Sequence, residues 1–193
     1  MLSQATSERR LVRALQRGDE AAFDELVRLH QHKVFGLCVR LLGDRAEAED
    51  VAQEVFLSVF VSIRTFRGES LLSTWLYRIT RNHCLNRLKF LKRRAFDRQK
   101  PLAEEGEPSP VGTVLASASP RPDQMAEGRQ MEVLLERAIG ELSDEHRELV
   151  VLRDLENLSY EEIEVITGLA EGTVKSRLHR ARMELARKLS PYL

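Results

Sequence analysis

Five of the six prolines in the chain fall between Pro101 and Pro122, and this clustering divides the sequence into two parts. A proline in a helix interior removes a hydrogen bond and clashes with the preceding turn. The same stretch has no hydrophobic periodicity, so residues 97–128 are predicted to form a flexible linker between two domains. Outside it, glycine and proline are sparse and strand-forming runs are few, which favours an all-α fold.

Helical periodicity is clear in the first domain, which is expected over residues 1–96. Apolar residues recur at spacings of three and four over residues 23–41, and Gly43 ends the pattern. A second helix is expected over residues 45–63, and a third over about residues 71–94. We therefore predict a small helical bundle.

The second domain, expected over residues 129–193, has the signals of a helix-turn-helix among four helices. Ser159 and Glu162 have the spacing of a capping box. Gly168 can adopt the positive φ that the turn between the two helices requires. The last helix is predicted over residues 171–189.

The last helix has one apolar and one basic face. At 100° per residue, Val174 and Leu178 fall on a stripe that faces inward. The outward face and its flanks can reach phosphates and base edges in a major groove. An ordinary basic helix of a bundle is the alternative. The candidate DNA contacts are Thr173, Lys175, Ser176, Arg177, His179, Arg180 and Arg182.

The formal net charge of zero hides a strong segregation of charge. Residues 44–56 carry five acidic side chains against Arg45 alone, whereas residues 78–100 carry nine Lys or Arg against Asp97 alone. Binding to DNA depends on local basic surface, because phosphate neutralisation releases counterions locally. The separate acidic segment indicates a second partner that is not DNA.

Other features indicate the compartment and argue against enzymatic chemistry. Cys38 and Cys84 lie in apolar helical patterns without a CxxC spacing, which indicates buried thiols in a reducing cytoplasm. The charged N-terminus is unlike a signal peptide, and the longest uncharged helical stretch, residues 55–63, is too short to span a bilayer. We expect a cytoplasmic protein with no membrane insertion. His30 and His32 face different sides of their helix and no P-loop is present, so no catalytic group, cofactor or metal is expected.

Two parts of the chain resemble the extracytoplasmic-function (ECF) sigma factors of bacterial RNA polymerase. The segments that carry the resemblance are residues 46–57, 66–70 and 74–79 for region 2 of that family, and residues 159–163, Gly168 and residues 172–182 for region 4. The resemblance implies a dissociable initiation subunit whose partners are the RNA polymerase core enzyme and promoter DNA. Region 2 would bind core and recognise and melt the −10 element, and region 4 would read the duplex −35 element. It also implies a stress or environmental response, restraint by an anti-sigma factor and a monomeric free state.

The resemblance assigns residues to these roles. The core-polymerase surface would be Asp50, Gln53, Glu54 and Leu57, which share one helix face. The −10 contacts would be Phe66, Arg67, Arg78, Arg81 and Asn82, with Asn82 reading a flipped base and Trp75 in the core. The chain departs from the family at Glu164, Thr167, Ala170 and residues 71–73, and Ala170 forgoes a side-chain cap worth about 1 kcal/mol.

Three alternatives compete with this interpretation. A stand-alone helix-turn-helix regulator would explain the second domain but leave the acidic helix without a role. A His-based phosphotransfer enzyme has no supporting motif. An adaptor such as an anti-sigma protein would not need two basic helices that face DNA.

Overall fold

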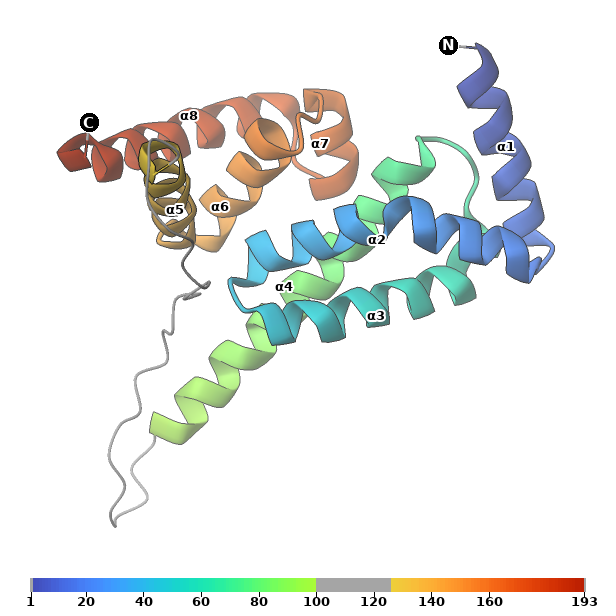
Figure 1. Ribbon diagram of the computed structural model, residues 1–193, viewed down its shortest axis with the longest axis horizontal. Coiled ribbons are helices and arrows are strands. Elements are labelled where there is room, and N and C mark those ends of the chain that lie inside the picture. Colours follow the sequence, from blue (N-terminus) through green and yellow to red (C-terminus); the bar gives the residue numbers. More distant parts are fainter. Residues whose placement is uncertain (1, 100–125, 193) are drawn as a thin grey trace.

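In the part of the chain that the computed structural model describes, residues 2–99 and 126–192, all regular structure is helical (Figure 1). The first bundle consists of α1 (Leu2–Gln16), α2 (Glu20–Leu42), α3 (Arg45–Ser62), a 3₁₀ turn (Ile63–Thr65) and α4 (Leu72–Gln99). The second consists of α5 (Ala126–Gly140), α6 (Asp144–Val150), a π-helical turn (Val151–Leu155), α7 (Tyr160–Thr167), α8 (Glu171–Leu189) and a 3₁₀ turn (Ser190–Tyr192). The expected all-α fold with a helix-turn-helix is confirmed.

The structure differs from the expected elements at three places. The first helix, α1, was not anticipated. The third predicted helix, α4, extends to Gln99, and α5 begins at Ala126, so helix is present at both ends of the segment assigned to the linker. The rest of the predicted flexible linker, residues 100–125, lies outside the described residues.

Side-chain caps and left-handed glycines determine where the helices begin and end. The carboxylate of Asp44 begins α3 by accepting a hydrogen bond from the backbone N–H of Glu47 at 3.0 Å. Gly43, which ends α2, has φ of 72°, as does Gly168 at the end of α7. A side chain at these positions would be strained, because only glycine adopts positive φ without a steric penalty. Both glycines were predicted from the sequence as helix ends.

The helix-turn-helix begins with the predicted capping box. Ser159 Oγ accepts from the backbone N–H of Glu162 at 3.1 Å, and the Glu162 carboxylate accepts from the N–H of Ser159 at 2.8 Å. At the start of α8, Ala170 makes no side-chain cap, as its apolar side chain requires. One end of the motif is therefore reinforced and the other is not.

The core of the first bundle lies between α2, α3 and α4, which pack on one another. Leu26, Val51 and Leu76 are among its buried side chains, and each such burial stabilises the fold by about 1.5–3 kcal/mol. Trp75 is only 7% exposed, which confirms its prediction as a core residue. The hydrogen bond with Cys38 first, and burial second, raise the pKa of the Cys84 thiol above its ordinary value.

The second bundle packs directly against the first, with α7 beside α4 and α6 beside α2 (Figure 1). The contact is rich in polar pairs that join the two bundles. They are Arg81 with Glu148, Arg40 and Tyr77 with Glu156, Thr74 with Glu162, Lys92 with Asp144, and Arg147 with the carbonyl of Leu41. We call this set the inter-bundle contact.

None of the helices in the described part of the chain is long and apolar enough to cross a bilayer.

Candidate nucleic-acid and polymerase interfaces

The helix α8 presents a basic face to solvent, as its sequence pattern predicted. Val174 and Leu178 are buried against α7 and α6, and this packing orients the helix. The outward positions Lys175, Ser176, His179 and Arg180 are exposed, whereas Thr173 is half-buried. The Arg180 guanidinium contacts only the carbonyl of Ser176, at 3.4 Å, and no carboxylate in the described residues pairs with it.

The arginines that flank this face are held by carboxylates of the same bundle. Arg177 donates to Glu145 at 2.8 Å, and Arg182 Nε donates to Asp154 at 3.1 Å. The bond to Asp154 raises the pKa of Arg182 above its already high ordinary value. Because each guanidinium has further N–H groups, it can hold its carboxylate and still reach a phosphate. Arg177 and Arg182 are therefore oriented by carboxylates, whereas Arg180 has only the Ser176 carbonyl as a partner in the described residues.

The face of α3 predicted to bind polymerase is exposed and partly apolar. Asp50, Gln53 and Leu57 lie on it, and the Leu57 side chain is 69% exposed. Phe60 and Val61, 55% and 79% exposed, extend this surface toward the end of the helix and were missed by the sequence analysis. The helical spacing could have identified them, since Phe60 and Val61 follow Leu57 by three and four residues in the apolar segment of residues 55–63.

Glu54 differs from its neighbours on α3. Its carboxylate accepts from Arg87 of α4 at 2.7 Å and lies 3.6 Å from the ring of His83. Arg87 also donates to Glu47 at 2.5 Å, and these pairs raise its pKa in spite of the opposing effect of burial. Glu54 therefore connects α3 to α4 as well as lining the candidate polymerase surface.

Four of the five residues predicted to contact the −10 element fall into two groups in space. Arg78 and Asn82 are exposed one turn apart on α4, so they can act together. Arg67 is exposed on the loop before α4, whereas Phe66 is 7% exposed and its ring packs on Trp75 with centroids 5.2 Å apart. Phe66 in this position supports the loop and does not offer its face to a base.

Arg81 belongs to neither group, because the second bundle holds it. Its guanidinium donates to both carboxylate oxygens of Glu148, and the two side chains are 19% and 7% exposed. Beside this pair the Tyr77 hydroxyl donates to Glu156 at 2.7 Å. Burial first, and this hydrogen bond second, raise the pKa of Tyr77, so the hydroxyl remains protonated. In this arrangement the second bundle covers most of Arg81, which sets it apart from the exposed Arg78 and Asn82.

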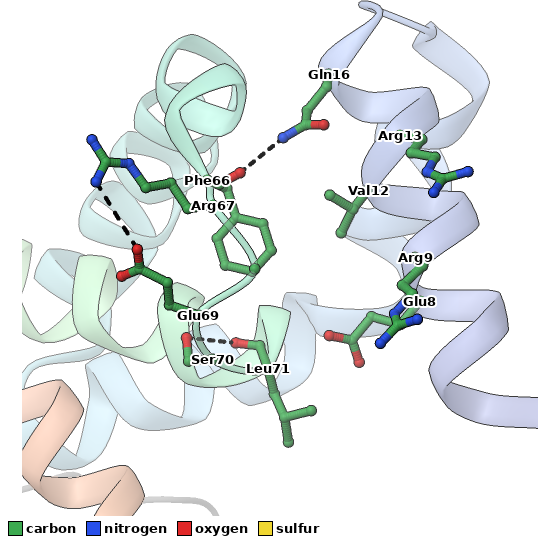
Figure 2. Close-up of a pocket in the computed structure, with 11 residues that line it drawn as sticks. Glu8, Arg9, Val12, Arg13, Gln16, Phe66, Arg67, Glu69, Ser70 and Leu71 are labelled. Carbon is green, nitrogen blue, oxygen red and sulfur yellow. Dashed lines mark hydrogen bonds and ion pairs between the residues drawn. The ribbon is translucent and has the colours of Figure 1, made fainter. Parts of the chain in front are cut away.

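A cavity of about 610 Å³ lies between α1 and the loop of residues 66–71 (Figure 2). Two hydrogen bonds connect its walls. Gln16 Nε2 donates to the carbonyl of Phe66 at 2.9 Å, and the Glu8 carboxylate accepts from the backbone N–H of Leu72 at 2.8 Å. Arg9 and Arg13 of α1 also line the cavity. These α1 residues were not predicted from the sequence, although Leu11 and Leu15 mark the buried side of an amphipathic helix.

Comparison with known proteins places the chain in a family. Residues 26–94 match the family model of sigma-70 region 2, and residues 132–185 match that of sigma-70 region 4. The chain is 38% identical to the RNA polymerase sigma-H factor of Pseudomonas aeruginosa, over all of this chain and 98% of the relative. It is 37% identical to the ECF RNA polymerase sigma-E factor of Haemophilus influenzae, over the full length of both chains.

The fold agrees with this assignment. The sigma factor RpoE of Bartonella quintana, solved in complex with the anti-sigma factor NepR, superimposes with a TM-score of 0.66 at 25% identity. That match covers 87% of this chain and 96% of the other. CnrH, solved in complex with the cytosolic domain of CnrY, has the same fold, with a TM-score of 0.65 at 21% identity. Sigma factors are transcription initiation factors and not catalysts. The chain belongs to the ECF family of RNA polymerase sigma factors.

Proposed function

We propose that this chain is a dissociable subunit that directs bacterial RNA polymerase core to promoters with −10 and −35 elements and starts DNA melting. The observation that carries the proposal is the separation of two different surfaces on two bundles. One is the exposed basic face of α8, and the other is the exposed acidic and apolar face of α3. A regulator that only binds DNA would have no use for the second surface.

The α3 face would dock on the core enzyme through Asp50, Gln53, Glu54 and Leu57, extended by Phe60. Its exposed apolar side chains are typical of a protein interface, because such groups gain free energy when a partner removes them from water. The acidic side chains of Asp50 and Glu54 on the same face favour a basic partner surface. This part of α3 is therefore suited to a strong and specific contact.

The α8 face would read the −35 element as duplex DNA. It lacks Asn and Gln, the usual bidentate partners of adenine, so we expect arginine–guanine contacts, phosphate contacts and groove shape to dominate. Arg180 is the first candidate for a base, because no carboxylate in the described residues holds it. Arg177 and Arg182 would contact phosphates while keeping their carboxylate partners.

The −10 element would be recognised as a single strand by α4 and the loop before it. Arg67 and Arg78 would bind the backbone, Asn82 would bind a base, and Phe66 would act by supporting the loop. Extracting a base from the stack costs a few kcal/mol, which these contacts must return as binding energy. Arg81 would join them only after the second bundle releases it.

We also propose that the chain acts in the cytoplasm as a monomer when free, in an environmental response restrained by an anti-sigma factor. The support is the similarity to RpoE of Bartonella quintana, which was solved with an anti-sigma factor. The exposed apolar residues of α3 are a suitable target, since covering Leu57 and Val61 would block the polymerase surface. The signal that releases the chain would act on that inhibitor.

The proposal is tested by transcription from a genomic library with purified core enzyme. Adding the chain to core should produce specific transcripts, and Leu57→Asp should abolish them without changing the fold, because Leu57 is 69% exposed. Lys33→Asp, also on an exposed position of the first bundle, is the matched control and should leave transcription unchanged. A complete lack of specific transcripts with the unchanged chain would refute the proposal.

The stand-alone regulator remains the second candidate, because the DNA-reading face of α8 is exposed without any partner. A gel-shift experiment distinguishes the two. Specific binding of the chain alone to the recovered promoters, equal with and without core, would favour the regulator. Specific binding that requires core would favour the sigma subunit.

A further inference from the structure

We propose that Arg87 of α4 is a positioning residue for polymerase binding, which holds the Glu54 carboxylate ready to bond to a cationic group of the core enzyme. The inference rests on the proposed function, because it concerns the α3 face that would dock on core. It adds a residue of α4, a helix to which only DNA contacts were assigned. Its basis is the pair of hydrogen bonds by which one guanidinium holds two carboxylates of α3.

Polar side chains join α3 to α4, which pack against each other in the first bundle (Figure 1). Glu54 and Ser58 follow Glu47 by seven and eleven residues, so the three lie on one side of α3. His83 and Arg87 are four residues apart on α4, which places them one turn from each other. The Glu54 carboxylate therefore lies where the proposed docking face of α3 meets α4.

The Arg87 guanidinium bonds to both acidic side chains at once. Its Nη1 donates to Glu47 at 2.5 Å, and its Nη2 donates to Oε1 of Glu54 at 2.7 Å. The second oxygen of Glu54 lies 3.6 Å from Nδ1 of His83, and Nε2 of that ring is hydrogen-bonded to Ser58 Oγ at 2.8 Å. Each carboxylate oxygen of Glu54 thus has a neighbour on α4 that restricts its position.

Glu54 can still bind a partner while these contacts persist. Its side chain is 49% exposed, whereas that of Arg87 is 20% exposed. A carboxylate has about four lone-pair sites, so it can accept further hydrogen bonds. The two carboxylates also outnumber the one guanidinium, and the group keeps a net negative charge. A cation of the core enzyme would therefore meet a negative group that is already in place.

The benefit of this arrangement lies in the dissociation step. A glutamate side chain loses rotamer freedom when a partner immobilises it, and this loss weakens the complex. Arg87 restricts Glu54 before core arrives, so less freedom is lost on binding. The positive charge of Arg87 does not favour the approach of a basic surface. Removing Arg87 should therefore raise the dissociation rate constant without lowering the association rate constant, whereas damage to the fold would lower the fraction of chain that binds.

The test measures both rate constants for the full chain and immobilised core enzyme by biolayer interferometry. Arg87→Met keeps most of the side-chain length and removes the charge, and it should raise the dissociation rate constant about three- to tenfold. Arg87→Lys keeps the charge but lacks the planar fork that holds two carboxylates, so its rate should be intermediate. The matched control is Arg93→Met, the same change at an exposed position of α4, which should leave dissociation unchanged.

A double-mutant cycle tests whether Arg87 acts through Glu54. Glu54→Gln should weaken core binding by the unchanged chain, but it should add less than about twofold to the effect of Arg87→Met. Asp50→Asn should keep its full effect in both backgrounds, because no bond joins Asp50 to Arg87 in the described residues. Thermal unfolding of each variant checks the fold, and Arg87→Lys replaces Arg87→Met in the cycle if the latter does not fold.

Three results would overturn the inference: unchanged dissociation of Arg87→Met, slower dissociation of Arg87→Met, or a full effect of Glu54→Gln in both backgrounds. The second would show that Arg87 shields Glu54 from core, and the third that Arg87 does not act through Glu54. All three leave the proposed function intact, because the unchanged chain binds core in each. If the unchanged chain does not bind core, the proposed function is refuted and the inference with it.

Discussion

Removing the carboxylates of the inter-bundle contact should separate the two bundles. Glu148 and Glu156, both in the second bundle, together hold Arg81, Arg40 and Tyr77 of the first. The variant Glu148→Gln/Glu156→Gln keeps the shape of both side chains and removes their charge. The −10 and −35 elements lie about 25 base pairs apart, or ~85 Å along B-form DNA, so bundles in direct contact cannot bind both. If the chain binds both elements as proposed, the contact must therefore break.

The free energy lost in this variant is set by how deeply the two pairs are buried. Hydrogen bonds to charged groups contribute roughly 1.5–3 kcal/mol each, and Arg81 and Glu148 are 19% and 7% exposed, so solvent screens them little. We expect a loss of about 2 kcal/mol at each glutamate. Together these losses shift the equilibrium between closed and open arrangements about a thousandfold toward the open one.

Small-angle X-ray scattering of the free chain provides the measurement. A compact chain of this length has a radius of gyration of about 16 Å, and the double variant should rise clearly above the unchanged protein. The control is Glu141→Gln/Glu145→Gln, which removes the same charge from ion pairs inside the second bundle. An unchanged radius in the Glu148/Glu156 variant, or an equal rise in the control, would refute the reasoning.

Three further predictions concern single positions. Ser159→Ala should lower the free energy of unfolding by about 1 kcal/mol in urea titrations, because it removes the cap of α7. Arg180→Ala should reduce promoter binding by the holoenzyme by roughly 1–3 kcal/mol for guanine-containing sites if it reads a base; a uniform loss with a flatter salt slope would show a phosphate contact. His30 has a pKa below its ordinary 6.5, through burial first and then the nearby Lys33, with Glu8 opposing. The folded state thus binds fewer protons than the unfolded chain, so this contribution to stability is present above pH 6.5 and is lost as the pH falls through the folded pKa. His30→Gln should flatten that decline in urea unfolding between pH 7.5 and 5.5, and an unaltered decline would exclude this cause.

Local rules predicted the second bundle well. The bounds of α8, the positive φ of Gly168 and the capping box of Ser159 depend on residues within a few positions of each other, and the structure confirms each of them. The alternation of buried and exposed residues on α8 follows from the helical period alone. Such features can be predicted from a sequence because the residues that cause them are close together in it.

Contacts distant in sequence could not be predicted in the same way. The Arg81–Glu148 pair joins positions 67 residues apart, and nothing near Arg81 indicates that a carboxylate covers it. The burial of Phe66 depends on Trp75 across a loop, so its aromatic character alone suggested a base contact. The role of α1 likewise depends on Gln16 and Glu8 reaching a loop 50 or more residues away. These are properties of the packed molecule.

The helix α4 has a geometric consequence for initiation. It runs without interruption from Leu72 to Gln99, a length of about 42 Å at 1.5 Å per residue. Its start bonds to α1, and Arg87 further along fastens it to Glu47 and Glu54 of α3. If α3 docks on polymerase as proposed, no joint separates that anchor from Arg78 and Asn82. The helix would then hold the captured base at a constant distance from the enzyme. That distance would determine where along the DNA the transcript begins.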